Sequence, residues 1–203
     1  MTTPRHWRAP LERRARLREA AVAHIARHGL ADLNLHTLAA EAGMKFDIAR
    51  HHYRTNQALL LDVVRTHHSA LGEVLADPIL ASRELAGTER LYALIAAVLD
   101  AMITAGDWHR ATTVVVAAYR GIAYEVRNAD AWLRNELADA LGPQCNALAH
   151  SLLVLIEYWA LLLPGSDMAV RGECLTVLVG MAQAVGRVAA KGKRRQGGRK
   201  VAK

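Results

Sequence analysis

The sequence predicts an all-α protein of about nine helices. Hydrophobic residues make up 52% of the 203 residues, and most of this excess is Ala and Leu, which are good helix formers. Strand-type clusters are rare, and TTVVVAAY is the one segment that could be mistaken for a strand. The five prolines lie at the edges of the predicted segments, as expected for a helical chain.

Three helices are predicted near the N-terminus, at residues 11–28, 35–43 and 46–53. Gly29 is placed to end the first helix, and Asn34 is a good N-cap for the second. Gly43 then supplies a turn before the third helix. Two short helices separated by a glycine turn, the second of them polar and cationic, are typical of a helix-turn-helix.

The third helix is expected to have two different faces. Ile48, Ala49 and Tyr53 are positioned to pack inward. Lys45, Asp47, Arg50 and His51 are expected to project outward, as a helix that enters a major groove requires.

The rest of the chain is predicted to form further amphipathic helices and a tail. A fourth helix begins near Thr55, and residues 77–87 are interpreted as a short irregular link. Five more helices are predicted at residues 88–105, 107–127, 129–141, 143–163 and 167–190. The last two are the most apolar, so they either pack into their own core or form half of a four-helix dimer interface. The tail, residues 191–203, lacks apolar periodicity and is expected to be disordered.

The net charge of +7 is unevenly distributed. Residues 1–60 carry 10 basic and 5 acidic residues, residues 61–186 carry 8 and 14, and residues 187–203 carry 8 and none. A basic head, an acidic body and a basic tail indicate that the two ends meet a polyanion. The alternative, that the charges of the head only solvate an exposed helix, is weakened by the six arginines that cluster before residue 19.

Several function classes find no support in the sequence. There is no glycine-rich phosphate loop, no GxSxG and no HExxH, so no enzymatic activity and no cofactor is expected. The ten histidines follow no recognised ligand spacing, so no metal site is expected either. No apolar run reaches membrane-spanning length and no export signal precedes the first helix, which predicts a cytoplasmic protein with two free thiols, Cys145 and Cys174.

Residues 11–64 contain a series of short elements in a characteristic order. They are Ala20-Ala21, the Gly29 turn, the Asn34 cap, LAAEAG, a short helix that ends in His-aromatic, and QALLLDVV. Their joint spacing resembles the N-terminal DNA-binding region of the tetracycline-repressor (TetR) family. The resemblance covers about a quarter of the chain.

This resemblance implies a homodimeric, one-component transcription regulator, usually a repressor, that releases DNA when a small molecule binds its helical body. By position, the reading helix and the turn before it contain Lys45, Phe46, Asp47, Ile48, Arg50, His51 and Tyr53, while Asn34 and Thr37 begin the supporting helix. The chain departs from the family where KFDIAR replaces the usual Ser-Lys-Gly-Thr-Leu-Tyr and where Asn56 replaces the usual Lys. Phosphate binding, which that lysine would otherwise provide, is expected instead from Arg54 and the N-terminal arginines, among them Arg13, Arg14 and Arg16.

The combined prediction is a ligand-responsive regulator that binds a palindrome in double-stranded DNA. Residues 1–56 would form the DNA-binding domain, residues 57–190 the ligand-binding and dimerisation domain, with dimerisation through the last two helices, and residues 191–203 the tail. An unknown effector would bind among aromatic and sulfur side chains of the body: Met102, Trp108, Tyr119, Tyr124, Trp132 and Trp159. The alternative is a small-molecule-binding or scaffold protein whose degenerate helix-turn-helix no longer reads DNA.

Overall fold

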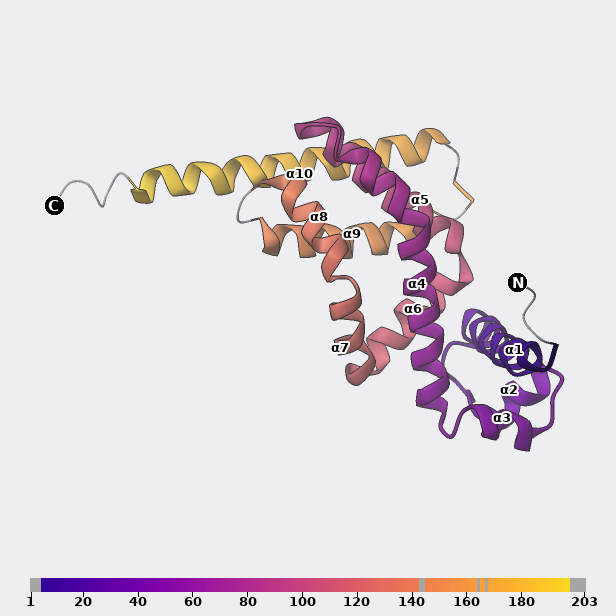
Figure 1. Ribbon diagram of the computed structural model, residues 1–203. Coiled ribbons are helices and arrows are strands. Elements are labelled where there is room, and N and C mark those ends of the chain that lie inside the picture. The colour runs from indigo at the N-terminus through magenta and orange to yellow at the C-terminus, as the bar shows by residue number, and fades with distance from the viewer. Residues whose placement is uncertain (1–4, 143–144, 164, 167, 198–203) are drawn as a thin grey trace. The chain divides into compact units, whose positions relative to one another are not determined.

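The structure, a computed structural model, describes residues 5–142, 145–163, 165–166 and 168–197. These residues form ten helices and no strand, which confirms the all-α prediction and exceeds the predicted number of helices by one (Figure 1). The helices are α1 (Arg5–His28), α2 (Leu35–Glu41), α3 (Phe46–His52), α4 (Asn56–Ser82), α5 (Gly87–Ala105), α6 (Asp107–Ala118), α7 (Arg120–Ala129), α8 (Ala131–Leu141), α9 (Asn146–Leu162) and α10 (Met168–Gly197).

The chain folds as two compact units. One comprises Met1–Ala70 with Ala105–Ala129, and the other comprises Leu71–Thr104 with Asp130–Lys203. The first unit therefore contains α1, α2 and α3 together with the start of α4, α6 and α7. The predicted functional boundaries at residues 56 and 190 stay a prediction, because the compact units describe packing and not activity.

The first unit has its own hydrophobic core, to which the short helices contribute one face each. The core includes Leu17, Ala21 and Ile25 of α1, Leu38 and Ala39 of α2, Ala49 of α3, Leu59, Leu60 and Val63 of α4, and Ala111 and Val115 of α6. Helices of seven residues, such as α2 and α3, are not stable alone in water. This shared core is what holds them in place.

Helix α4 runs through the segment that the sequence predicted to be a link. It continues past Pro78 to Ser82, so the irregular connection is limited to residues 83–86. A proline inside a helix leaves the carbonyl four residues earlier without its N–H partner. Here that residue is Val74, which is exposed together with Pro78, so water can reach this side of the helix and satisfy the carbonyl.

A second difference from the prediction lies at Tyr119, where one predicted helix over residues 107–127 is two helices. Tyr119 has an extended backbone (φ −120°, ψ 99°), which ends α6 before α7 begins at Arg120. Its ring is half-buried against the core of the first unit. No proline interrupts the sequence here, and the nearest glycine, Gly121, lies two residues further on, inside α7, so a break at Tyr119 had only a weak signal in the sequence.

The second unit is built from α5, α8, α9, α10 and the end of α4. Leu152, Ile156, Leu175 and Leu178 are among the residues of α9 and α10 that fill its core. Helix α10 continues to Gly197, although residues 191–203 were expected to be a disordered tail. Lys, Arg and Gln have good helix propensity, and basic residues are favoured at a helix C-terminus, which accounts for helix in residues 191–197. The remaining six residues of the predicted tail lie outside the described part of the chain.

Candidate nucleic-acid interface

The turn between α2 and α3 is closed by backbone contacts and by Arg16 from α1. Gly43 has φ of +64°, a left-handed conformation that glycine adopts without strain. The N–H of Met44 donates to the carbonyl of Ala39 at 2.9 Å. Arg16 donates from Nη2 to the carbonyls of Ala42 at 2.6 Å and Gly43 at 3.2 Å. These contacts satisfy carbonyls at the end of α2 and fix the direction in which α3 follows.

Asn34 caps the start of α2, as its position in the sequence predicted. Its Oδ1 accepts a hydrogen bond from the N–H of Thr37 at 2.9 Å. The side chain of Asn34 is exposed, whereas Thr37 is half-buried. Asn34 is therefore available to a ligand from outside, while Thr37 contributes mainly through its capped backbone.

Helix α3 has the two faces that the sequence predicted. Ala49 and Tyr53 are buried and Ile48 is half-buried. The exposed residues of the helix and the turn before it are Lys45, Phe46, Asp47, Arg50 and His51. These side chains place three nitrogen-bearing groups and one carboxylate on the solvent side of the helix.

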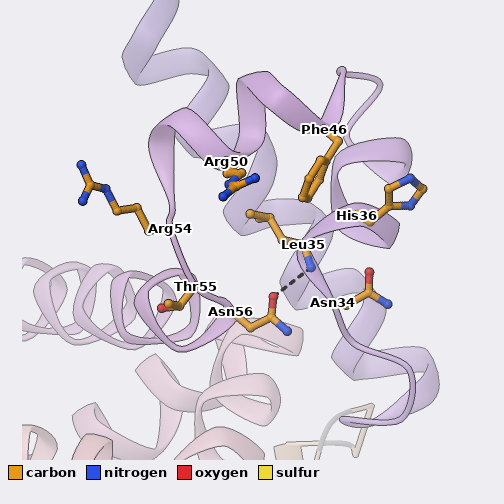
Figure 2. Close-up of a pocket in the computed structure, with 8 residues that line it drawn as sticks. All are labelled: Asn34, Leu35, His36, Phe46, Arg50, Arg54, Thr55 and Asn56. Atoms are coloured by element: carbon orange, nitrogen blue, oxygen red, sulfur yellow. Dashed lines mark hydrogen bonds between the residues drawn. The ribbon is translucent and has the colours of Figure 1, made fainter.

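A cavity of about 360 Å³ opens beside this exposed face (Figure 2). It is lined by Asn34, Leu35, His36, Phe46, Arg50, Arg54, Thr55 and Asn56, which come from the start of α2, from α3 and from the start of α4. A second hollow of about 540 Å³ is lined by Asp47, Arg50, His51 and Arg54. Arg50 and Arg54 line both hollows, so the two hollows are adjacent and share these two cationic side chains.

Four of the cavity residues were not predicted as site residues: Leu35, His36, Thr55 and Asn56. The His36 and Phe46 rings lie 5.6 Å apart at an angle of 45°, so that one ring comes from α2 and the other from α3. His36 could have been found from the sequence, because it lies two residues after the Asn34 cap, in the first turn of the predicted supporting helix. Asn56 carried no such signal, since its partners are more than 20 residues away.

Tyr53 and Arg14, both candidates for DNA contact, take part in an internal polar network. The hydroxyl of Tyr53 donates to the carboxylate of Asp62 and accepts from Nε of Arg14 at 3.3 Å. Arg14 and Arg18 donate to the same Asp62 oxygen at 3.1 Å and 3.0 Å. The network joins α1, the end of α3 and α4. Tyr53 is only 3% exposed, so its ring supports α3 from behind.

The network shifts the pKa values of its members. Burial alone would raise the pKa of Asp62, but hydrogen bonds from Tyr53 and Arg18 and the charge of Arg14 outweigh burial and lower it. Burial and the hydrogen bond to Asp62 raise the pKa of Tyr53. Asp62 is therefore a carboxylate and Tyr53 a neutral phenol at neutral pH, which keeps the hydroxyl a donor.

Two further histidines support the head from inside. His24 of α1 contacts Glu41 of α2 through Nδ1 at 2.9 Å and the carbonyl of Ala31 through Nε2 at 3.0 Å. The hydrogen bond to Glu41 raises the pKa of His24 against the opposing effect of burial. His52 is half-buried at the end of α3, and burial, with a smaller effect of nearby His51, lowers its pKa.

Comparison with known proteins gives matches at the level of structure. No family model matches the chain, and no curated protein matches its sequence. A bacterial regulatory protein in the TetR family from Rhodococcus RHA1 has a TM-score of 0.67 and 16% identity over 84% of this chain and 96% of that one. A TetR family transcription regulator from Marinobacter aquaeolei VT8 has a TM-score of 0.67 and 17% identity over 89% and 97%.

This chain has the TetR-type fold. The resemblance seen in residues 11–64 is thereby confirmed for most of the chain at the level of the fold. The multidrug binding protein EbrR, complexed with ethidium, has the same fold, with a TM-score of 0.55 and 22% identity over 82% of this chain and 98% of that one.

The residues suggested for an effector site are divided between the two units of this TetR-type fold. Trp108, Tyr119 and Tyr124 belong to the first unit, and Met102, Trp132 and Trp159 to the second. Met102 is buried in a core, Tyr124 and Trp132 are exposed, and the other three are half-buried. A common effector site for these six residues stays a prediction.

Other kinds of site find little support among the described residues. No group of three or more His, Cys, Asp or Glu side chains converges there as a metal site would require. Cys145 is buried, Cys174 is half-buried, and both are free thiols. No single described helix meets the length and hydropathy needed to cross a membrane, although two sharply bent helix pairs do so by length and composition alone.

Proposed function

We propose that the protein is a ligand-responsive transcriptional regulator that binds double-stranded DNA sequence-specifically as a homodimer. The observation that carries this proposal is the exposed cationic face of α3, next to two hollows that share Arg50 and Arg54. A short helix that buries one face and presents cationic side chains on the other has the shape needed to enter a major groove. No catalytic role is proposed.

The DNA-binding residues divide into two classes. Lys45, Arg50 and His51 would contact base edges, because they project from the exposed side of α3 and the turn before it. Phe46, 37% exposed, would touch a thymine methyl group. Arg54 and Arg13 are exposed cations that would contact phosphates, which orient the protein without specifying sequence. Asn34 and Asp47 border the same surface.

The exposed side of α9 and α10 supports dimerisation. Large apolar side chains face solvent along both helices: Val154, Tyr158 and Leu162 on α9, and Val170, Val177 and Met181 on α10. Within α9 these residues recur every four positions, so they form one stripe. A second copy of the chain would cover these stripes in a four-helix interface. The two reading helices would then bind half-sites spaced by about 34–36 Å or a little more.

The regulator would act in the cytoplasm, where an effector would shift it between DNA-competent and DNA-incompetent forms. Acidic residues outnumber basic ones in residues 61–186, which favours a neutral or cationic effector. The complex of the fold neighbour EbrR with ethidium, a cation, agrees with this direction. Repression rather than activation is the proposed default, since effector binding would release the DNA.

Selection of genomic DNA fragments by the purified full-length protein tests the proposal. The selected fragments are expected to share a palindrome. The logarithm of the association constant should fall linearly with the logarithm of the salt concentration, with a slope of about −0.9 per phosphate contacted. The double variant Arg50→Ala, His51→Ala should lose most of the preference for the palindrome, about 10-fold or more, because each base contact contributes about 1–3 kcal/mol. Arg110→Ala, which removes an exposed cation of α6, is the control and should bind as the wild type does.

Two results would contradict the proposal. Equal affinity of the wild type for the palindrome and for shuffled DNA would favour a scaffold or a small-molecule-binding protein with a degenerate head. Unchanged specificity in the double variant would mean that residues other than Arg50 and His51 read the bases.

A further inference from the structure

Asn56, the first residue of α4, reaches back to the backbone that leads into α2. Its Oδ1 accepts a hydrogen bond from the N–H of Leu35 at 2.9 Å, drawn as a dashed line in Figure 2. Its Nδ2 donates to the carbonyl of Leu33 at 3.2 Å. The two bonds hold the segment on both sides of Asn34 with one side chain that is itself half-buried.

The backbone groups that Asn56 contacts have few alternative hydrogen-bond partners. The first N–H groups of a helix have no partner inside the helix, and α2 has only seven residues. Asn34 satisfies the N–H of Thr37, and Asn56 satisfies that of Leu35. Two residues before Asn34, the chain passes through Asp32 at φ +54°, a left-handed conformation that Asp adopts more readily than most non-glycine residues, and Nδ2 of Asn34 donates to the Asp32 carbonyl at 2.9 Å. The chain that leads into α2 is thus held by Asn34 and Asn56 together.

The start of α2 also forms one wall of the cavity beside the reading helix. Leu35 and His36 line this cavity together with Phe46 and Arg50, and Asn56 lines it next to Thr55 (Figure 2). The hydrogen bonds of Asn56 thus connect α4 to the cavity wall formed by the start of α2, where the His36 ring lies against the Phe46 ring. A shift of the first turn of α2 would move that wall relative to α3.

We propose that Asn56 is a positioning residue that fixes the start of α2 against α4 and so sets the geometry of the base-reading surface. This inference rests on the proposed DNA-reading function. It also explains why asparagine suits this chain at a position where the family resemblance leads one to expect lysine. A lysine ammonium has three donors and no acceptor, so it cannot receive the N–H of Leu35. Asparagine supplies a donor and an acceptor at once.

The proposal makes a counter-intuitive prediction for Asn56→Lys. If residue 56 were simply a missing phosphate contact, the new charge would strengthen binding to the operator. Because the lysine cannot accept the N–H of Leu35 and would release the start of α2, we expect instead tighter binding to random DNA and about 10-fold lower preference for the operator. Asn56→Ala should weaken operator binding by about 10-fold without changing the salt slope, since no charge is removed.

Amide hydrogen exchange in the DNA-free, full-length protein tests the clamp independently of DNA. In Asn56→Ala the amide of Leu35 should exchange about 10-fold faster. The amide of Ala58, held by Oγ1 of Thr55 at 3.1 Å, is the internal reference. Asn56→Asp keeps an acceptor for the N–H of Leu35 and should retain most of its protection. Gln57→Ala, the exposed neighbour, is the matched control and should leave both exchange and DNA binding unchanged.

The outcomes separate this inference from the proposed function. A wild-type protein that selects no DNA sequence would refute the proposed function. A selective wild type together with unchanged Leu35 exchange in Asn56→Ala, or with undiminished operator preference in Asn56→Lys, would refute the positioning role. Circular dichroism spectra that match the wild type would exclude general unfolding of the variants.

Discussion

His67 of α4 lies against His109 of α6 in the interior of the first unit, and this pair predicts a dependence of stability on pH. His67 Nε2 and His109 Nδ1 are 3.4 Å apart, and the two residues are 3% and 4% exposed. Burial, followed by the neighbouring His109 and His68, lowers the pKa of His67 to about 3. The contact needs one ring nitrogen as donor and the other as acceptor, so protonation of the accepting ring would remove it.

The size of this pH-dependent loss of stability follows from the shift in the pKa of His67. The pKa of His67 in the folded protein is about 3, below the ordinary value of 6.5. The stabilisation is therefore fully present above pH 6.5 and is lost as the pH falls from 6.5 towards 3. At about 1.4 kcal/mol per pH unit, titration of the unfolded histidine between pH 7 and pH 5 should lower the free energy of unfolding by about 2 kcal/mol.

Urea denaturation at pH 7 and pH 5 measures this loss when the wild type is compared with His67→Gln. Glutamine keeps a polar group towards His109 but does not titrate. The free energy of unfolding of the wild type should therefore fall between the two pH values by about 2 kcal/mol more than that of His67→Gln. The comparison cancels contributions from other groups, such as His24, whose raised pKa acts in the opposite direction. His28→Gln, which removes an exposed histidine of α1, should behave as the wild type does.

Equal pH dependence in the wild type and in His67→Gln would refute this reasoning. The same conclusion would follow if NMR showed the His67 ring of the folded protein gaining its proton near pH 6.5. Either result would mean that water reaches the pair, and that the packing of α4 against α6 is looser than its burial indicates.

Two further predictions concern the internal network and the dimer. Tyr53→Phe removes the hydroxyl that Asp62 and Arg14 share, so it should lower the free energy of unfolding by about 1–2 kcal/mol in urea denaturation at pH 7. Tyr92→Phe, at an exposed residue of α5, should change nothing, and an equally stable Tyr53→Phe would show that the two arginines suffice for Asp62. Tyr158→Glu places a charge on the exposed apolar stripe of α9 and should shift sedimentation equilibrium towards the monomer, whereas Tyr92→Glu should not. A Tyr158→Glu protein that still dimerises fully would place the interface elsewhere.

The sequence predicted the fold well wherever local chemistry determines the structure. Gly43 takes the left-handed conformation expected of a turn, and Asn34 caps α2 as its residue type indicates. Prediction was wrong where a local signal was misleading or weak. Pro78 does not end α4, because the side of the helix it disturbs faces water, and α6 ends at Tyr119, a residue that does not itself break helices.

The exposed residues of the candidate site were similarly accessible to prediction, whereas its supporting contacts were not. Helical spacing alone separates Lys45, Arg50 and His51 from the buried Ala49. The partners of Asn56 and Asp62 come from other helices, and pairs such as Arg14 with Asp62 are 48 residues apart. A single sequence carries no signal for such long-range pairs, so Asn56 looked like the absence of a phosphate-binding lysine and Asp62 like an ordinary acid.

The distribution of charge acquires a different meaning once these partners are known. The arginines before residue 19 were interpreted as a surface for a polyanion. Arg14 and Arg18 instead neutralise Asp62, and Arg16 is engaged with carbonyls at the end of α2. Much of the basic charge of the head therefore holds α1 against α2, α3 and α4, and fewer cations remain for phosphates than composition suggests. A salt slope, which counts phosphate contacts, should accordingly reflect Arg13 and Arg54 rather than the whole basic head.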